Sequence, residues 1–193
     1  MRAAGLDPAA CAMFLIAAFL LAGVCQAWWL ASSASRRLAW PLDAGLTLRG
    51  RRVFGANKTV RGVIVMVPAT GAAFMTTAAV APWETFGAWP LSIAGYGALG
   101  VLAGAGFMAG ELPNSFLKRQ LAIAPGAPAR GPVARPLFSL IDRMDSALGM
   151  LAALAIAVPV PFATVVAVLA VGPAIHGLFS LLTFRLGGKA RAA

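Results

Sequence analysis

Four long stretches of this sequence carry no charged side chain, and they constrain the fold more than any other feature. They lie between Asp7 and Arg36 (28 residues), Arg61 and Glu84 (22), Glu84 and Glu111 (26), and Asp145 and Arg185 (39). A helix needs roughly 20 apolar residues to cross a hydrocarbon core of ~30 Å. The first three stretches therefore fit one membrane span each, and the fourth fits two.

The composition favours a membrane protein over a soluble one. Hydrophobic residues make up 60% of the 193 residues and charged residues 11%, against about 45–50% and about 25% in a typical soluble domain. The mean hydropathy is +0.83. A chain of this length could not bury so much apolar surface in water. We therefore expect an all-α, polytopic fold, with residues 1–193 forming a single integral membrane domain.

We predict five transmembrane helices and two long polar loops. Proline interrupts helices, so the turn between the last two helices is placed at Val158–Pro161. The fourth helix must then take its first turns from the segment that carries Asp142 and Asp145. The predicted helices cover residues 9–30, 62–81, 91–112, 142–158 and 163–184, and the predicted loops cover residues 31–61 and 113–141.

The basic residues predict the orientation. In this five-span arrangement 15 of the 16 Lys and Arg residues fall on one side of the membrane, and only Arg2 falls on the other. The positive-inside rule places the N-terminus outside and both long loops and the C-terminus in the cytosol. The net charge of +10 then faces the cytosol and suits anionic headgroups or nucleotide phosphates. Nucleic acid is not expected as a partner, because no aromatic residues alternate with these basic residues.

The first loop contains a basic, glycine-containing run, Gly50–Gly62, that suits phosphate binding. Glycine lets backbone N–H groups approach an anion, and Lys58 and Arg61 add charge-assisted hydrogen bonds. The run leads into the N-terminus of the second predicted span, where the helix dipole favours anions. It lacks the Walker A spacing, in which lysine follows the second glycine directly. The alternative is a basic patch that contacts anionic lipid.

Apart from Asp43, three acidic residues lie at or near the predicted cytosolic face. Carboxylates next to a membrane span are costly and usually have a role. Asp142 and Asp145 are three residues apart and share one helix face, and Glu111 closes the neighbouring span. Oxygen ligands of this kind suit Mg²⁺. The alternative is a structural ion pair between Asp142 and Arg143 or Lys118.

Glycines are frequent in the third predicted span. Two pairs, Gly100 with Gly104 and Gly106 with Gly110, have the small-xxx-small spacing of closely packed membrane helices. We expect this span to contact its neighbours at short range.

Two separated motifs resemble the signature of membrane CTP:lipid-phosphate cytidylyltransferases. They are Gly110–Arg119 (GELPNSFLKR) and Ile141–Ser146 (IDRMDS). In phosphatidate cytidylyltransferases the signature reads G-D-L-x-x-S-x-x-K-R and then D-R-x-D-S. The segment Pro41–Gly62 is similar to CDP-archaeol synthases, the smaller, five-helix branch of that superfamily, and the chain resembles a bacterial-type member of it.

The sequence departs from the family pattern at four positions. Glu111 stands where aspartate is usual, Ala56 where archaeal members often have aspartate, and Val60 where they often have tryptophan. Pro113 lies inside the signature and is expected to bend or restart the helix.

The resemblance implies an enzyme that joins CTP to a lipid phosphate, either phosphatidate or an ether-lipid analogue. It releases pyrophosphate and supplies CDP-lipid for phospholipid synthesis. The site would face the cytosol at a bacterial inner membrane, with Mg²⁺ or Mn²⁺ as cofactor; assembly into oligomers is left open. The residues implied are Asp142, Asp145 and Lys118 for catalysis, Glu111, Asp142 and Asp145 for the metal, and Asn57, Lys58, Thr59, Arg61, Ser115 and Arg119 for the nucleotide and its phosphates.

Two other functions remain open on the sequence. A transporter of anionic lipid or solute would place polar groups near the bilayer midplane and repeat its halves, and Glu111 is the nearest candidate for such a group. A non-catalytic relative that binds CDP-lipid or anionic headgroups would keep the basic loops and tolerate loss of the acids, yet all three acids are present.

The orientation can be tested by cysteine labelling. In a variant that carries Ser33→Cys and lacks Cys11 and Cys25, a membrane-impermeant maleimide should label the protein in inverted vesicles but not in intact cells, because Ser33 begins the first basic loop. Labelling from outside intact cells would reverse the predicted topology.

Overall fold

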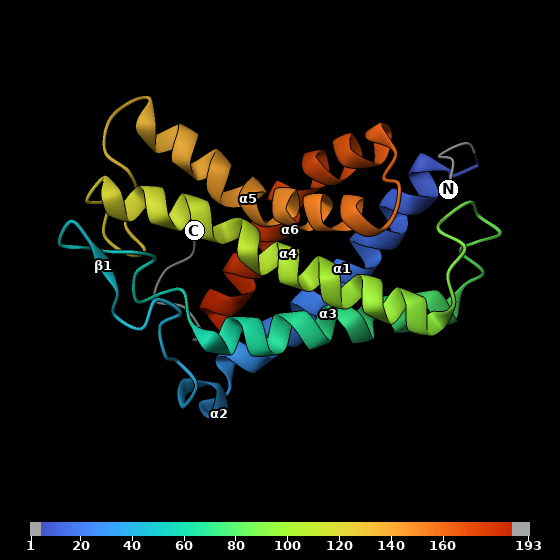
Figure 1. Cartoon of the computed structure of the whole chain (residues 1–193), viewed down its shortest axis with the longest axis horizontal. Coiled ribbons are helices and arrows are strands. Elements are labelled where there is room, and N and C mark those ends of the chain that lie inside the picture. The colour runs from blue at the N-terminus through green and yellow to red at the C-terminus, as the bar shows by residue number, and fades with distance from the viewer. Residues whose placement is uncertain (1–4, 187–193) are drawn as a thin grey trace.

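Five long helices of the described chain run back and forth along one axis of the protein (Figure 1). The computed structural model describes residues 5–186, so Arg2, Lys189 and Arg191, which the orientation argument counts, lie outside the described residues. The long helices are α1 (Pro8–Ala31), α3 (Val60–Val80), α4 (Ile93–Gln120), α5 (Ala134–Ala157) and α6 (Phe162–Arg185). The small elements are α2 (Ser33–Arg36) and the strands β1 (Thr47–Leu48) and β2 (Arg51–Arg52).

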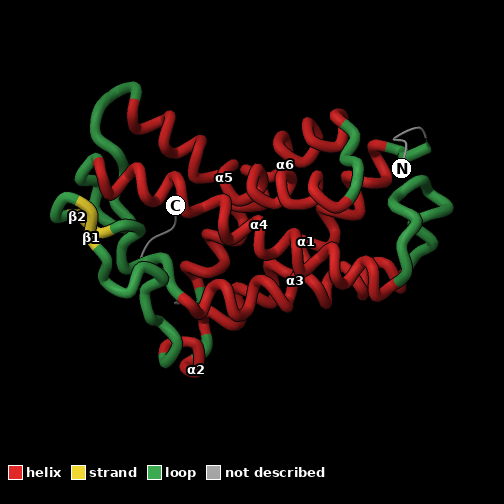
Figure 2. Tube along the Cα trace, viewed as in Figure 1, coloured by secondary structure: helices red, strands yellow, loops and turns green. Residues whose placement is uncertain are grey.

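The connecting segments gather at the two ends of the bundle (Figure 2). We call the end with residues 32–59 and 121–133 the loop end. The opposite end carries residues 81–92 and the short turn of residues 158–161. Four connections thus separate five antiparallel helices, and the two long, basic ones lie at the same end.

The all-α membrane architecture is confirmed, with one qualification on the spans. Within residues 5–186, four helices are long and apolar enough to cross a membrane, namely α1, α3, α4 and α6. Helix α5 is as long as α1, but its first half carries Arg135, Asp142, Arg143 and Asp145. The five predicted helices are all present, and a fifth span through α5 stays a prediction.

The helix boundaries follow local signals. The Asp7 side chain accepts a hydrogen bond from the N–H of Ala10 (2.8 Å) and Pro8 occupies the first turn of α1. Ser92 caps α4 in the same way through the N–H of Gly95 (3.1 Å). Helix α5 ends at Ala157 and α6 begins at Phe162, which confirms the turn predicted at Val158–Pro161.

Helix α4 is longer than predicted. It continues through Pro113 to Gln120, so the helix does not restart at Pro113, and the other expectation, a bend there, stays a prediction. Helix α5 already begins at Ala134. Proline is tolerated inside a membrane helix when neighbouring helices hold it in place, and α4 packs against both α3 and α5. The second loop therefore shrinks from residues 113–141 to residues 121–133.

The apolar core contains a cluster of aromatic rings. Phe14 of α1 is fully buried and lies edge-on to Phe74 of α3, with ring centroids 5.2 Å apart. It also contacts the Tyr96 ring at 4.7 Å. Trp89 donates a hydrogen bond from Nε1 to the carbonyl of Pro159 (2.8 Å) and so ties the two short connections together.

Glycines on two faces of α4 allow its neighbours to approach closely. A Cβ on Gly100 would lie 2.6 Å from the carbonyl oxygen of Thr70 in α3. On the other face, a Cβ on Gly106 or Gly110 would lie 2.5 Å or less from backbone oxygens of α5. The pair Gly100 and Gly104 therefore packs against α3, and the pair Gly106 and Gly110 packs against α5.

Gly149 is the partner of the second pair and provides a test. A Cβ at Gly149 would lie 2.3 Å from the Gly106 carbonyl oxygen, so Gly149→Ala should force α4 and α5 apart. Overpacking of this kind costs about 1–3 kcal/mol and should lower the thermal unfolding midpoint in detergent. Gly177→Ala in α6 is the matched control, because no atom lies within 4 Å of its added Cβ. Equal midpoints for the two variants would contradict the close contact.

Candidate functional site

The three predicted acidic residues meet at the loop end, between α4 and α5. On α4, Glu111, Asn114, Ser115 and Lys118 share one face through the i, i+3, i+4 and i+7 spacing. On α5, Asp142, Asp145 and Ser146 share the face that also carries Gly149. The close contact of Gly106 and Gly110 in α4 with Gly149 in α5 brings these two polar faces together.

Two short polar side chains link the acids. Ser146 donates from Oγ to Glu111 Oε1 (2.8 Å) and from its backbone N–H to Asp145 Oδ1 (2.7 Å), which also lies 3.3 Å from Oγ. Asn114 donates from Nδ2 to Asp142 Oδ1 (2.6 Å) and to Asp145 Oδ2 (2.8 Å). The result is one continuous row of polar groups in which Asp145, almost fully buried, lies in the middle.

A lysine closes the row at each end. Lys58, from the loop before α3, forms an ion pair with Glu111 of α4. Lys118 forms an ion pair with Asp142 and lies 5.6 Å from the centre of the Phe138 ring. The ion pair that the sequence left open for Asp142 is therefore present, with Lys118 as the partner. Three carboxylates and two ammonium groups nearly balance in charge.

The loop of residues 38–61 folds back on itself. β1 and β2 pair antiparallel, with Thr47 opposite Arg52, around a turn in which Arg49 and Gly50 have φ values of 52° and 75°. Such a turn suits tight hairpins. At the base of the loop, Leu42 donates to the carbonyl of Lys58 (2.8 Å) and Val60 to that of Trp40 (2.9 Å). The loop therefore returns to its starting point directly at Lys58.

The buried carboxylate of Asp43 lies inside this loop. It accepts hydrogen bonds from the backbone N–H groups of Gly45 (3.1 Å), Phe54 (3.0 Å) and Gly55 (2.9 Å), and it forms an ion pair with Arg52. The Arg52 guanidinium, together with these N–H groups, holds the pKa of Asp43 well below its usual range, against the effect of burial, which raises it. The same contact raises the pKa of Arg52.

Arg119 is a buried cation beside the acidic row. Within the described chain, its Nε and Nη1 atoms are buried without a hydrogen-bond partner. Its side chain packs under Gly55, whose φ is +91° and whose added Cβ would lie 3.1 Å from Arg119 Cδ. The Nε of Arg61 is likewise buried and unpaired, while the Arg61 carbonyl accepts from Trp29 Nε1 (3.2 Å).

The structure brings together most of the residues selected from the sequence. Ser115 is buried on the site face of α4, Asn57 is exposed, and Thr59 precedes α3 and pairs with Pro41 through the backbone. Three residues of this region were not selected: Asn114, Ser146 and Asp43. Asn114 and Ser146 stand inside the quoted motifs, and their spacing from Glu111 and Asp142 could have indicated a place on the same faces.

The donor set is compatible with a hard cation. Asp142 and Asp145 converge on one amide group, and the Oδ1 atom of that Asn114 amide is buried without a partner among the described residues. These are oxygen ligands of the kind that Mg²⁺ and Mn²⁺ take. Within residues 5–186, no three His, Cys, Asp or Glu side chains are placed to hold a metal ion by themselves. A cation would therefore need further oxygens, such as those of substrate phosphates.

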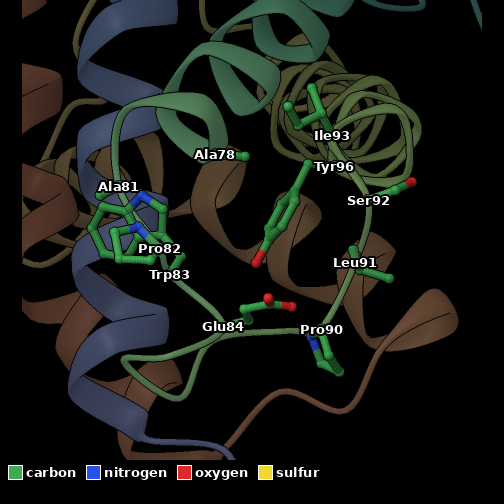
Figure 3. Close-up of a pocket in the computed structure, with 10 residues that line it drawn as sticks. All are labelled: Ala78, Ala81, Pro82, Trp83, Glu84, Pro90, Leu91, Ser92, Ile93 and Tyr96. Carbon is green, nitrogen blue, oxygen red and sulfur yellow. The ribbon is translucent and has the colours of Figure 1, made fainter.

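A cavity of about 420 Å³ lies at the opposite end of the bundle. Figure 3 shows the Tyr96 ring and the Glu84 carboxylate turned toward this space, between the end of α3 and the start of α4. No lysine or arginine is among its lining residues. It lacks the positive charge that phosphates require, so this cavity is not a candidate phosphate site.

The chain is similar to known CDP-archaeol synthases over most of its length. A family model described as CDP-archaeol synthase, CarS-like, matches residues 31–191. The CDP-archaeol synthase of Halobacterium salinarum is 34% identical over 163 residues, which cover 77% of this chain and 81% of the relative. The CDP-archaeol synthase of Pyrococcus furiosus is 32% identical over 154 residues, with the same coverage.

A solved structure is similar as well. It is described as an intramembrane enzyme for archaeal membrane lipids biosynthesis and superposes with a TM-score of 0.51 at 28% sequence identity. The match covers 81% of this chain and 89% of that chain. The structural similarity therefore extends over most of the helical bundle.

The Asp43 contacts predict how the loop responds to acid. Because the folded-state pKa is depressed, the carboxylate stabilises the loop above the pKa of an unfolded aspartate, about 3.9. That stability is lost as the pH falls through the lower folded-state pKa. The amide NMR signals of Phe54 and Gly55 should keep their positions down to about pH 4 and shift only below it. A midpoint near the free aspartate value would contradict these contacts.

Proposed function

The chain belongs to the CarS-like CDP-archaeol synthase family, and we propose that it carries out its reaction in the polar row at the loop end. It is an integral membrane enzyme, a CTP-dependent cytidylyltransferase that makes a CDP-lipid. One observation supports this location of the active site. Three carboxylates, two lysines and the unpaired guanidinium of Arg119 come together there from two helices and one loop.

The reaction is a phosphoryl-type transfer at the α-phosphorus of CTP. An oxygen of the lipid phosphate forms a bond to this phosphorus, the bond between the α-phosphorus and the bridging oxygen breaks, and pyrophosphate leaves with the electron pair. Such a transfer needs positioning and charge neutralisation rather than a covalent enzyme intermediate. The loop end supplies both kinds of charge at one place.

The basic residues hold the phosphates. Arg119 has two buried N–H groups without partners, and a phosphate oxygen would satisfy them at much lower cost than leaving them unpaired. Lys58 and Lys118 are paired with carboxylates through flexible stems, and each can turn toward a phosphate as substrates enter. Arg61 and the backbone from Asn57 to Thr59, at the start of α3, complete the nucleotide side.

The acidic residues would hold a divalent cation. Asn114 joins Asp142 to Asp145, and Ser146 joins Glu111 to the same row. When bound, Mg²⁺ or Mn²⁺ would neutralise phosphate charge and polarise the α-phosphate. Asn114 and Ser146 fix the rotamers of the three carboxylates, so the ligands are arranged before the nucleotide arrives.

The proposal extends to the substrate and the membrane side. The lipid phosphate is phosphatidate or its ether-linked analogue, and the product feeds phospholipid synthesis. The protein lies in the inner membrane of a bacterial cell. Its loop end faces the cytosol, because basic loops are retained on the cytosolic side of a membrane. CTP can then enter from water while the lipid tails remain in the bilayer.

The direct experiment is an assay of the purified protein in detergent or vesicles. Labelled CTP is incubated with Mg²⁺ and, in separate reactions, with ester-linked phosphatidate or the ether-linked analogue, and CDP-lipid and pyrophosphate are measured. Equal amounts of both products with one lipid and none without lipid would support the function and identify the substrate. Absence of CDP-lipid with every lipid phosphate would refute it.

The acids give the sharpest variant test. Asp145→Asn is nearly isosteric but a poorer ligand for a hard cation, so turnover should fall at least about 100-fold, as for loss of a catalytic electrostatic group, while the protein still inserts and folds. Glu111→Asp restores the usual family residue and should keep part of the activity. Glu84→Gln, at the opposite end, is the control. Full metal-dependent turnover by Asp145→Asn would make the acids structural ion-pair partners.

A further inference from the structure

We propose that Asp43 is a positioning residue for nucleotide binding, which acts by holding the loop of residues 41–59 against the site. The inference rests on the function proposed above and adds a residue that contacts neither the acidic row nor its lysines. Its carboxylate replaces the apolar core that this loop lacks.

The burial pattern of the loop shows why a single carboxylate matters. From residue 32 to residue 59 the buried residues are Ser35, Asp43 and Gly55, and none of them has a large apolar side chain. Leu46 and Leu48 are exposed, and so is Trp40. Burial of apolar surface therefore contributes little to the order of this loop, and polar contacts must supply it.

Asp43 supplies those contacts from the centre of the loop. Its Oδ1 accepts from the N–H of Gly45 and from Arg52, and its Oδ2 accepts from the N–H groups of Phe54 and Gly55 and from Arg52 Nε. The carboxylate thus joins the outgoing arm of the hairpin to the returning arm. Both oxygens are fully used, so Asp43 is not free to hold a metal or a proton of the substrate.

Two short paths lead from Asp43 to the groups that hold phosphates. On the first, Gly55 accepts at its carbonyl from the N–H of Lys58 (3.4 Å), and Leu42, next to Asp43, donates to the Lys58 carbonyl (2.8 Å). The backbone of Lys58 is therefore fixed from both sides, which directs its side chain to Glu111.

The second path leads to Arg119. Gly55, held by Asp43 at 2.9 Å, lies directly on the Arg119 side chain and on Pro125, whose Cγ would be 3.2 Å from an added Cβ. The loop thereby covers the unpaired guanidinium and keeps it in one place. Release of Gly55 would free both the loop and the Arg119 side chain, and the phosphates of the nucleotide would meet a less organised site.

The test compares Asp43→Asn with Lys58→Ala. The asparagine keeps the size of the side chain, but its NH₂ group faces N–H donors on one side, so the loop should open. Lys58→Ala removes a phosphate contact and leaves the Asp43 contacts intact. Arg52→Gln should be milder than Asp43→Asn, because three backbone N–H groups still bind the carboxylate. Glu84→Gln is the control for an acid remote from the loop.

Three quantities are measured on each full-length protein in detergent: hydrogen exchange of peptides within residues 41–59, the Kd for CTP, and the KM for the lipid phosphate. Asp43→Asn should lose exchange protection in this loop only, raise the Kd for CTP about tenfold or more, and leave the KM for lipid unchanged. Lys58→Ala should raise the Kd for CTP with loop protection intact.

Any of the following outcomes would contradict the inference. Unchanged loop protection in Asp43→Asn would mean that the carboxylate does not order the loop. Lost protection with an unchanged Kd would mean that loop order does not serve the nucleotide. Lost protection throughout α3 and α4, or an equal effect on both substrates, would make Asp43 a general folding residue. If the parent protein makes no CDP-lipid at all, the proposed function fails, and the exchange data still decide whether Asp43 orders the loop.

Discussion

The backbone contact between α4 and α5 is the constraint on which the site depends. Gly106 and Gly110 face Gly149 so closely that a methyl group on any of them would meet backbone atoms at 2.5 Å or less. Only at this separation can side chains as short as serine and asparagine link carboxylates on two helices. With larger residues at the contact, the helices would lie at an ordinary distance of about 8–10 Å, and the polar row would break into isolated acids.

That row also explains how three carboxylates are tolerated beside a membrane. Each outer acid has a lysine, and the inner acid, Asp145, is held by neutral donors of Asn114 and Ser146. Removal of either lysine would leave a partly buried carboxylate without its partner, which costs more than the pair contributes. Lys58 comes from a loop and Lys118 from the helix itself. In the function proposed above, substrate phosphates would compete with the carboxylates for these two ammonium groups.

Much of this architecture could be predicted from the sequence, because it follows from periodic and local signals. The uncharged stretches located the five helices, the prolines located the turn after Val158, and the spacing of Asp142 and Asp145 placed them on one face. The predicted helix end at residue 112 was wrong, because packing on both sides of α4 overrides the local effect of Pro113. Asn114 and Ser146 acquire their roles only when two helices meet, which no spacing within one helix reveals. The shape of the first loop was equally hidden, because it depends on contacts between Asp43 and residues as much as 12 positions away.

The two halves of the site are therefore ordered by different physics. The acids stand on helices that are held by packing against neighbours, which is the available means of order within lipid. The loop that carries Lys58 has almost no apolar burial and is held by hydrogen bonds to one carboxylate. Local opening costs least where few apolar contacts must be broken, so the loop can open while the helices remain in place. In the function proposed above, this separation would let the loop adjust to a water-soluble nucleotide while the helices that carry the acids keep their geometry.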